Sequence, residues 1–140
     1  MKKLLFAAAI AAIALTSCKK TNSDEAKAIT KENIIGSFKV TAMTYTANGV
    51  TIDGMANMTA CEKDDIHIFK ATDAYEYTDA GTKCDPDGGY TSTWTLSADV
   101  ITIDGESGKI TLLTATRMET TSTYETGNGS ATIKTTLTRQ

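Results

Sequence analysis

Short runs of β-branched and aromatic residues, separated by tight turn signals, make up the sequence from residue 37 onward. Roughly a fifth of all residues are threonine and there is a single proline, a composition typical of β-strands. Asp104-Gly105 and Asn128-Gly129 are dipeptides that tolerate positive φ in hairpin turns. We predict eight strands, over residues 37–47, 64–70, 73–79, 89–97, 99–104, 108–115, 117–126 and 130–139.

The short connections between these strands limit how they can be arranged. Strands joined by tight turns are antiparallel neighbours. An open meander of eight strands would leave two unpaired edges, whereas closure into an up-and-down barrel removes both. We therefore expect an all-β fold with an antiparallel barrel of about eight strands, and a β-sandwich is the alternative. Thr30 can cap a short helical turn that ends at Gly36, just before the first strand.

The first 18 residues resemble a bacterial lipoprotein signal peptide. Basic Lys2 and Lys3 precede an apolar run of about a dozen residues, too short to span a bilayer, which needs about 20. Small residues then lead to Cys18, as in a lipobox. We expect residues 1–17 to be removed and Cys18 to carry the lipid. A transmembrane helix and a plain cleaved signal are the alternatives.

This N-terminus divides the chain into three parts and predicts its location. Residues 1–17 are the signal peptide, residues 18–29 are the lipidated cysteine with a polar flexible tether, and residues 30–140 are the domain. A lipidated Cys18 would anchor the protein in the bacterial cell envelope. Lys19 and Lys20 stand where an inner-membrane retention signal has Asp, which favours the outer membrane, facing either the periplasm or the outside.

Cys61 and Cys84 remain as an even pair once Cys18 is lipidated. In an oxidising compartment such a pair predicts a disulfide. The two cysteines flank a predicted hairpin, which would bring them to the same end. The alternative is a zinc site formed by Cys61, Cys84, His67 and an aspartate, but the spacing lacks the close Cys-x-x-Cys pairs of structural zinc sites. We expect no metal and no cofactor.

Alternation along the predicted strands indicates which side chains face the barrel interior. The expected inward sets are Tyr90, Trp94 and Leu96; Phe38, Val40 and Ala42; Ile66 and Ile68; Tyr75 and Tyr77; Met118 and Tyr124; and Ile133 and Leu137. Met43 and Tyr45 fall on the opposite register from Phe38 and Val40, which predicts a β-bulge near Ala42.

Charge and motif content exclude several classes of function. Loss of Lys2 and Lys3 with the signal would leave 12 basic residues against 17 acidic ones, and no basic stripe is present to bind nucleic acid. His67 is the sole histidine and no recognisable motif places a nucleophile beside it. We expect no catalytic residues and no enzyme.

Several motifs recur in the order found in one known family. They are Ile35-Gly36-Ser37-Phe38, Cys61-Glu62-Lys63-Asp64-Asp65 before Ile66-His67-Ile68-Phe69, Thr93-Trp94-Thr95-Leu96, and the final Thr138-Arg139-Gln140. Over residues 30–140 the chain resembles the lipocalin-like lipoprotein domains of Bacteroides and related bacteria. The resemblance implies a lipocalin-like barrel. It also implies that Arg139 closes the barrel base over Phe38, which replaces the family's tryptophan and offers a weaker cation–π partner.

Two functions are consistent with these features. The first is a lipid-anchored binding protein whose open barrel end, rimmed by residues 48–60 and 80–88, holds a small apolar or amphipathic molecule. Its candidate ligand-binding residues are Tyr45, Met55, Met58, Tyr90 and Trp94. The alternative is a non-enzymatic envelope interaction module with a filled barrel, which would bind another envelope protein through its loops or an exposed strand.

Overall fold

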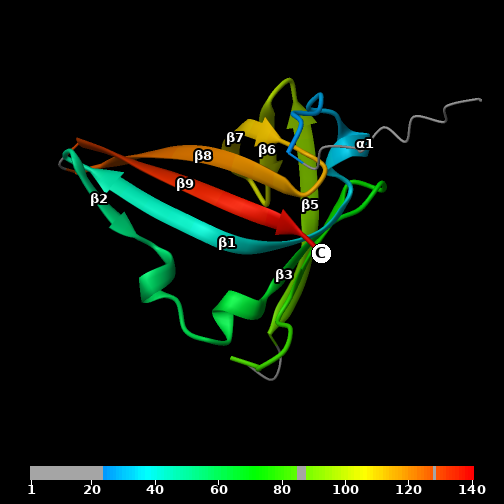
Figure 1. The fold of residues 1–140 in the computed structure, drawn as a ribbon, viewed down its shortest axis with the longest axis horizontal. Coiled ribbons are helices and arrows are strands. Elements are labelled where there is room, and N and C mark those ends of the chain that lie inside the picture. Colours follow the sequence, from blue (N-terminus) through cyan, green and yellow to red (C-terminus); the bar gives the residue numbers. More distant parts are fainter. Residues whose placement is uncertain (1–23, 85–87, 128) are drawn as a thin grey trace, which may run out of the picture.

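The computed structural model describes residues 24–84, 88–127 and 129–140, and within them the chain forms a sheet of nine strands (Figure 1). The elements in chain order are α1 (Lys31–Ile34), β1 (Gly36–Ala47), β2 (Val50–Asp53), the 3-10 turns η1 (Met55–Asn57) and η2 (Glu62–Asp64), β3 (Ile66–Phe69), β4 (Ala74–Thr78), β5 (Gly89–Ser97), β6 (Val100–Ile103), β7 (Glu106–Leu113), β8 (Arg117–Thr126) and β9 (Gly129–Arg139). No helix among the described residues is long and apolar enough to cross a bilayer.

The strands close into a barrel. They pair antiparallel in the order β1, β3, β4, β5, β6, β7, β8 and β9, and β9 returns to pair with β1 along most of its length. The predicted eight-stranded up-and-down barrel is therefore confirmed. The β-sandwich alternative is wrong, because one sheet closes on itself instead of two sheets packing face to face.

An extra strand, β2, was not predicted. It pairs with the distal half of β1, from Thr44 opposite Asp53 to Ala47 opposite Val50. The turn between them is Asn48-Gly49, and both residues have positive φ, at 51° and 76°. That is the backbone of the two-residue hairpin turns that Asn-Gly favours. The segment expected to be rim loop therefore begins as a strand.

A β-bulge shapes the inner face of β1. The register with β9 shifts between Val40 and Ala42, as the sequence predicted. The extra residue lets Val40 and Met43 both face the interior, although they are an odd number of positions apart. The expectation that Ala42 faces inward with Val40 is wrong, because Ala42 follows the bulge and is exposed. A second shift in β7 lies between Ile110 and Leu112.

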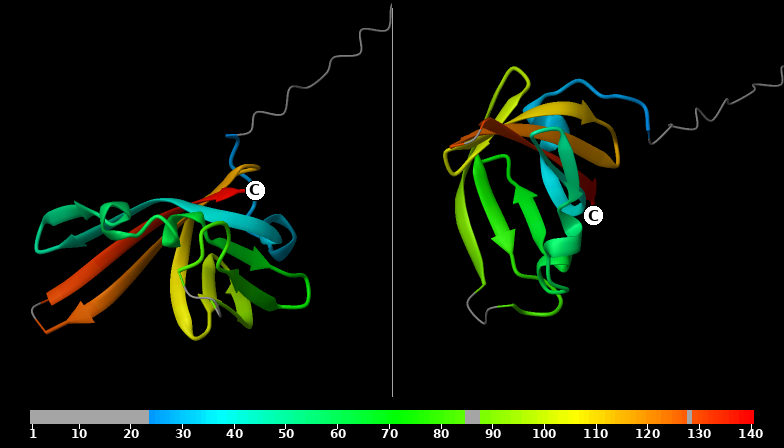
Figure 2. Two further views of the ribbon diagram at one scale, coloured as in Figure 1. Left: turned by 90° about the horizontal axis from the view of Figure 1, so that it is seen from below. Right: turned by 90° about the vertical axis from the view of Figure 1, so that its left-hand side faces the viewer.

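One end of the barrel is closed by a compact core. Ile34 of α1, Phe38 of β1 and Trp94 of β5 are each fully buried. The Oγ1 atom of Thr30 accepts a hydrogen bond from the backbone N–H of Asn33 at 3.4 Å, so Thr30 is the N-cap of α1, as predicted. Figure 2 shows α1 lying across this end, while the turn between β1 and β2 and the tips of β8 and β9 extend away from it.

Two further expected inward sets differ from the structure. On β3 the inward residues are His67 and Phe69, which line the interior, while Ile66 and Ile68 are only half-buried on the other face. The prediction for the two isoleucines is wrong because apolar residues occupy both faces of this strand, so alternation alone could not identify the inner one. Tyr90 is 50% exposed because it lies at the open end of the barrel, beyond the core that buries Trp94.

Candidate functional site

The barrel encloses a cavity of about 260 Å³ toward its open end. Its apolar wall comes from seven residues on five strands: Val40, Met43, Phe69, Ile101, Ile103, Met118 and Leu137. Polar groups on the same wall are His67, Tyr75, Ser107, Thr120, Ser122 and Thr135. Exposed Glu106 and Tyr124 lie at the mouth. An apolar cavity with a few inward polar groups is the usual form of a small-molecule site.

The register of the long strands explains this lining. Along β8, the alternate residues Met118, Thr120, Ser122 and Tyr124 all face the cavity. Directly opposite on β9, Leu137 pairs with Met118 and Thr135 pairs with Thr120. Because period-2 alternation places these residues on one face, the sequence prediction that Met118 and Tyr124 face inward is confirmed.

A hydrogen-bonded pair of polar side chains lies in the cavity wall. The Nδ1 atom of His67 and the hydroxyl of Tyr75 are 2.6 Å apart, joining β3 to β4. Burial lowers the pKa of His67 below its ordinary value of 6.5, opposed by the nearby charge of Asp65. Burial also raises the pKa of Tyr75 above its ordinary value, with a further contribution from Tyr90. Both groups are therefore neutral near pH 7, and the pair offers hydrogen bonding without charge.

The five candidate ligand-binding residues lie elsewhere. Tyr45 is on the distal part of β1, half-buried Met55 and Met58 lie in and just after η1, and Trp94 is buried at the closed end. Tyr90 stacks on Tyr77 with ring centroids 5.3 Å apart. None of these five is among the described residues that line the cavity. They were chosen by residue type, whereas the lining follows strand register.

The two residues expected to close the barrel base are in contact. The guanidinium carbon of Arg139 lies 4.5 Å from the centroid of the Phe38 ring. Nη1 of Arg139 donates to the carbonyl of Ile35 at 2.8 Å, and Nη2 donates to the carbonyl of Asn33 at 2.6 Å. The last strand is thereby tied to α1 at the closed end.

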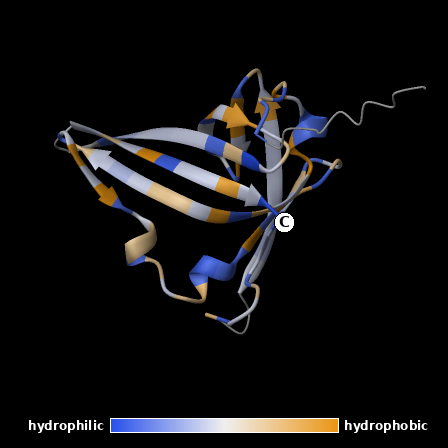
Figure 3. Cartoon of the chain, viewed as in Figure 1, coloured by the Kyte–Doolittle hydropathy of each residue, from blue (hydrophilic) through white to orange (hydrophobic). Residues whose placement is uncertain are grey.

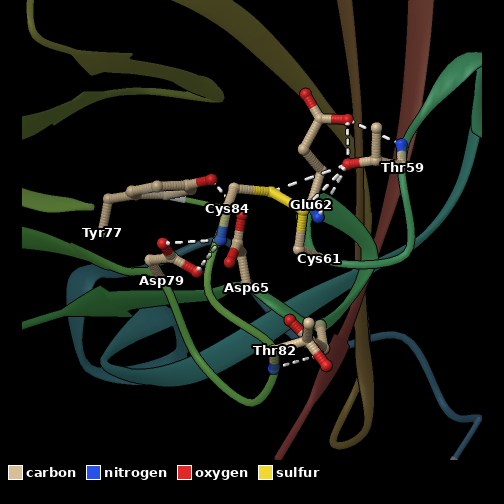
Figure 4. The surroundings of a disulfide bond; sticks show 9 residues. Thr59, Cys61, Glu62, Asp65, Tyr77, Asp79, Thr82 and Cys84 are labelled. Atoms are coloured by element: carbon tan, nitrogen blue, oxygen red, sulfur yellow. Dashed lines mark hydrogen bonds between the residues drawn. A yellow bond between two sulfur atoms is a disulfide. The ribbon is translucent and has the colours of Figure 1, made fainter. Parts of the chain in front are cut away.

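Cys61 and Cys84 form the predicted disulfide, with Cα atoms 5.3 Å apart (Figure 4). The bond joins the segment before β3 to the segment after β4. It uses both thiolates that the zinc alternative would need, so that alternative is wrong. Among the described residues, no group of three or more His, Cys, Asp or Glu side chains could hold a metal ion.

Buried carboxylates surround this disulfide. Asp65 and Asp79 are 4% and 3% exposed. The hydroxyl of Tyr77 donates to Asp65, and the backbone N–H of Cys84 donates to Oδ2 of Asp79 at 3.2 Å (Figure 4). Desolvation, followed by the hydrogen bond to Asp65, raises the pKa of Tyr77 above its ordinary value. These contacts hold the two segments joined by the disulfide against β4, at one side of the open end of the barrel.

The model of one protein family, the lipocalin-like domain, matches residues 34–123, well over half of the chain. The chain belongs to the lipocalin-like domain family. The match begins in α1 and runs through the barrel strands as far as β8. No curated protein and no solved structure matched the chain.

Membership of the lipocalin-like family agrees with the closed barrel and its cavity. Lipocalin-like proteins are in general binding proteins, which makes the cavity the candidate functional site of this domain. Cys18, the predicted lipidation site, lies outside the described residues, as does the whole predicted signal peptide.

Proposed function

We propose that this lipocalin-like domain is a lipid-anchored protein of the bacterial cell envelope that binds a small apolar or amphipathic molecule, without catalysing a reaction. The observation that carries the proposal is the cavity of about 260 Å³, whose apolar wall is interrupted by the neutral His67–Tyr75 pair. A filled barrel, as the alternative interaction module requires, would have side chains in this space. The lipobox-like sequence ending at Cys18 supports the anchor.

The position of the N-terminal segment gives the anchored domain an orientation. The backbone N–H of Lys27 donates to the carbonyl of Leu113 at 2.7 Å, which holds the segment before α1 at the closed end. Only a few residues separate Cys18 from Asp24, the first described residue, and six residues reach at most about 20 Å. A lipid on Cys18 would therefore hold the closed end near the membrane, with the cavity mouth turned away from it.

Ligand binding is tested by filling the cavity. Thr120 lines it, so Thr120→Phe should remove most of the available volume. The purified variant should therefore bind a solvatochromic naphthyl dye more weakly than the wild-type protein does. Thr123→Phe is the matched control, since Thr123 is exposed on the same strand and faces outward. If neither the wild-type protein nor the control binds the dye or any co-purified small molecule, the interaction module becomes the better hypothesis.

The anchor is tested separately in cells that process lipoproteins. Labelled palmitate should be incorporated into the full chain, and Cys18→Ala should abolish the label. Cys84→Ala, which removes a cysteine of the folded domain, should leave the label in place. Label that persists in the Cys18→Ala protein, or no label in the wild-type protein, would reject lipidation at this residue.

A further inference from the structure

Four strands extend beyond the body of the barrel and form a four-stranded projection, which we term the flap, made of residues 44–53, 121–127 and 129–134. β1, β8 and β9 have 12, 10 and 11 residues, whereas β3, β4 and β6 have four or five. Figures 1 and 2 show the ends of β1, β8 and β9, with β2 alongside, projecting past the shorter strands. The flap therefore lacks the opposite wall that covers the inner face of the barrel.

One face of the flap is apolar. In one cross-strand row Tyr45 stands opposite Ile52 on β2 and Ile133 on β9. In the next row on the same face, Ala47 stands opposite Val50 and Ala131, and Ala131 stands opposite Tyr124. Figure 3 shows hydrophobic residues on β2. The row between these two is threonine on every strand, at residues 46, 51, 123 and 132.

This apolar face is uncovered. Tyr45 is 36% exposed, Ile52 is 52% exposed and Val50 is 64% exposed. Tyr124, on the same face, is 41% exposed. Only Tyr90 and Val100 are comparably exposed large hydrophobic residues elsewhere in the described chain. A contiguous exposed apolar surface of this kind marks a binding surface more often than a chance arrangement.

The apolar face of the flap is continuous with the cavity. Ser122 and Tyr124 belong to the flap and also line the cavity, beside their cross-strand partners Ile133 and Ala131. The cavity alone, at about 260 Å³, is just below the range of about 300 to 1,000 Å³ typical of sites that enclose drug-sized ligands. A ligand longer than the cavity would leave it across Tyr124 and continue over the other apolar residues of the flap.

The charges around the cavity limit the chemistry of such a ligand. Glu106, at the mouth, is the only Asp or Glu among the described lining residues, and no Lys or Arg is among them. The neutral His67–Tyr75 pair supplies no positive charge within. A ligand carboxylate placed here would face a like charge and would have no cationic partner. This arrangement disfavours the binding of anions.

We propose that the ligand is an elongated amphiphile without a negative charge, one end of which fills the cavity while the rest lies on the apolar face of the flap. This inference rests on the proposed binding function and specifies its ligand class. Glu106 further favours a ligand that carries a basic group near the mouth.

Matched alkyl ligands test the charge requirement. Dodecanol, dodecylamine and dodecanoate share one chain and differ in their polar group. At pH 7 the alcohol and the amine should displace the naphthyl dye, and dodecanoate should bind about tenfold more weakly. Glu106→Gln should reduce that difference in affinity, because the variant should bind dodecylamine more weakly and dodecanoate more tightly. Equal or tighter binding of dodecanoate would overturn the charge inference while leaving the binding function intact.

Exposed substitutions test the role of the flap. The double variant Tyr45→Thr/Ile52→Thr should bind dodecanol about fivefold or more weakly, because apolar contact is lost. Its affinity for octanol, which is shorter, should be nearly unchanged. Val100→Thr is the matched control, because Val100 is 36% exposed, as Tyr45 is, but lies on β6 outside the flap. An unchanged affinity for dodecanol would overturn the flap contact.

Two further outcomes separate the inference from its premises. If the wild-type protein binds none of the alkyl ligands and no dye, the proposed binding function itself fails. If sedimentation shows that the wild-type protein is a dimer and that the flap variant is a monomer, the flap is an interface between copies of this chain, and the flap contact is overturned. Circular dichroism of each variant verifies that the barrel remains folded.

Discussion

Arg139 lies over the ring of Phe38, with its guanidinium carbon 4.5 Å from the ring centroid, and donates hydrogen bonds to the carbonyls of Asn33 and Ile35. These carbonyls belong to the end of α1, where a helix leaves its last acceptors without partners. Gly36 makes room for the contact, since a Cβ atom there would lie 2.2 Å from Nη1 of Arg139. One side chain thus joins the first strand, the helix and the last strand of the barrel.

Arg139→Ala should lower the free energy of unfolding by about 2 to 4 kcal/mol, from one cation–π contact and two charge-assisted hydrogen bonds. Arg139→Lys should lose less, because it keeps the charge but not the planar fork that reaches both carbonyls. Urea denaturation measures both. Lys134→Ala, an exposed change on the same strand, is the control. Arg139→Ala and Lys134→Ala of equal stability would show that the contact does not stabilise the closed end.

Trp94→Ala should be among the most destabilising changes in the domain, at about 3 to 5 kcal/mol. The side chain is fully buried, packs edge-on against Phe69 with centroids 5.4 Å apart, and donates from Nε1 to the carbonyl of Lys70 at 3.0 Å. Thr95→Ala, at the adjacent exposed position, should change stability little. Thermal and urea unfolding provide the comparison, and a loss below about 1 kcal/mol for Trp94→Ala would contradict its place in the core.

Removing the disulfide should destabilise the domain by about 3 kcal/mol, because the bond closes a loop between residues 23 apart in sequence. Cys61→Ser/Cys84→Ser should unfold at lower urea concentration, and a reducing agent should then have no further effect on it. Neither cysteine is among the described residues of the cavity wall, so ligand affinity should change little at temperatures where the variant is folded. Two reactive thiols in the native wild-type domain would contradict the bond.

His67 should make the domain less stable in mild acid. Its folded-state pKa is lowered below 6.5 by burial, so the unfolded chain binds a proton more readily than the folded one. The free energy of unfolding therefore rises with pH in this window: the contribution is complete above about pH 6.5 and is lost as the pH falls. Because a single proton is involved, His67 can change the free energy of unfolding by at most about 1.4 kcal/mol per pH unit.

His67→Gln is the test of that dependence. Urea denaturation between pH 5.5 and 7.5 should show a shallower slope for the variant than for the wild-type protein, since carboxylates titrate mostly below this range. A slope of the same size in both proteins would assign the pH dependence to other groups.

Local signals in the sequence predicted most of the architecture. Asp104-Gly105 and the alternation along β8 are short-range features, and strand order follows from them because short turns permit only antiparallel neighbours. The disulfide followed from a count of cysteines and the predicted hairpin between them. Asn48-Gly49 carried an equally clear turn signal, and with it β2 could have been predicted from the sequence.

The binding-site prediction depended on information that no single segment carries. Met55 and Met58 were proposed because methionine suits adaptable surfaces, but the described cavity wall is formed by residues such as Thr120, Thr135 and Ser107, which are individually unremarkable. No sequence motif placed a partner beside His67, because its partner Tyr75 lies on the neighbouring strand. Only the register between β3 and β4 brings the two rings together.

The sequence by itself predicted that this chain forms an antiparallel barrel, because turn residues and period-2 alternation act over a few residues. The tertiary structure alone decided which side chains share the cavity and that the long strands project as a flap with an exposed apolar face. Both depend on strand stagger and on the bulge between Val40 and Ala42, which arise only when eight strands close around one core.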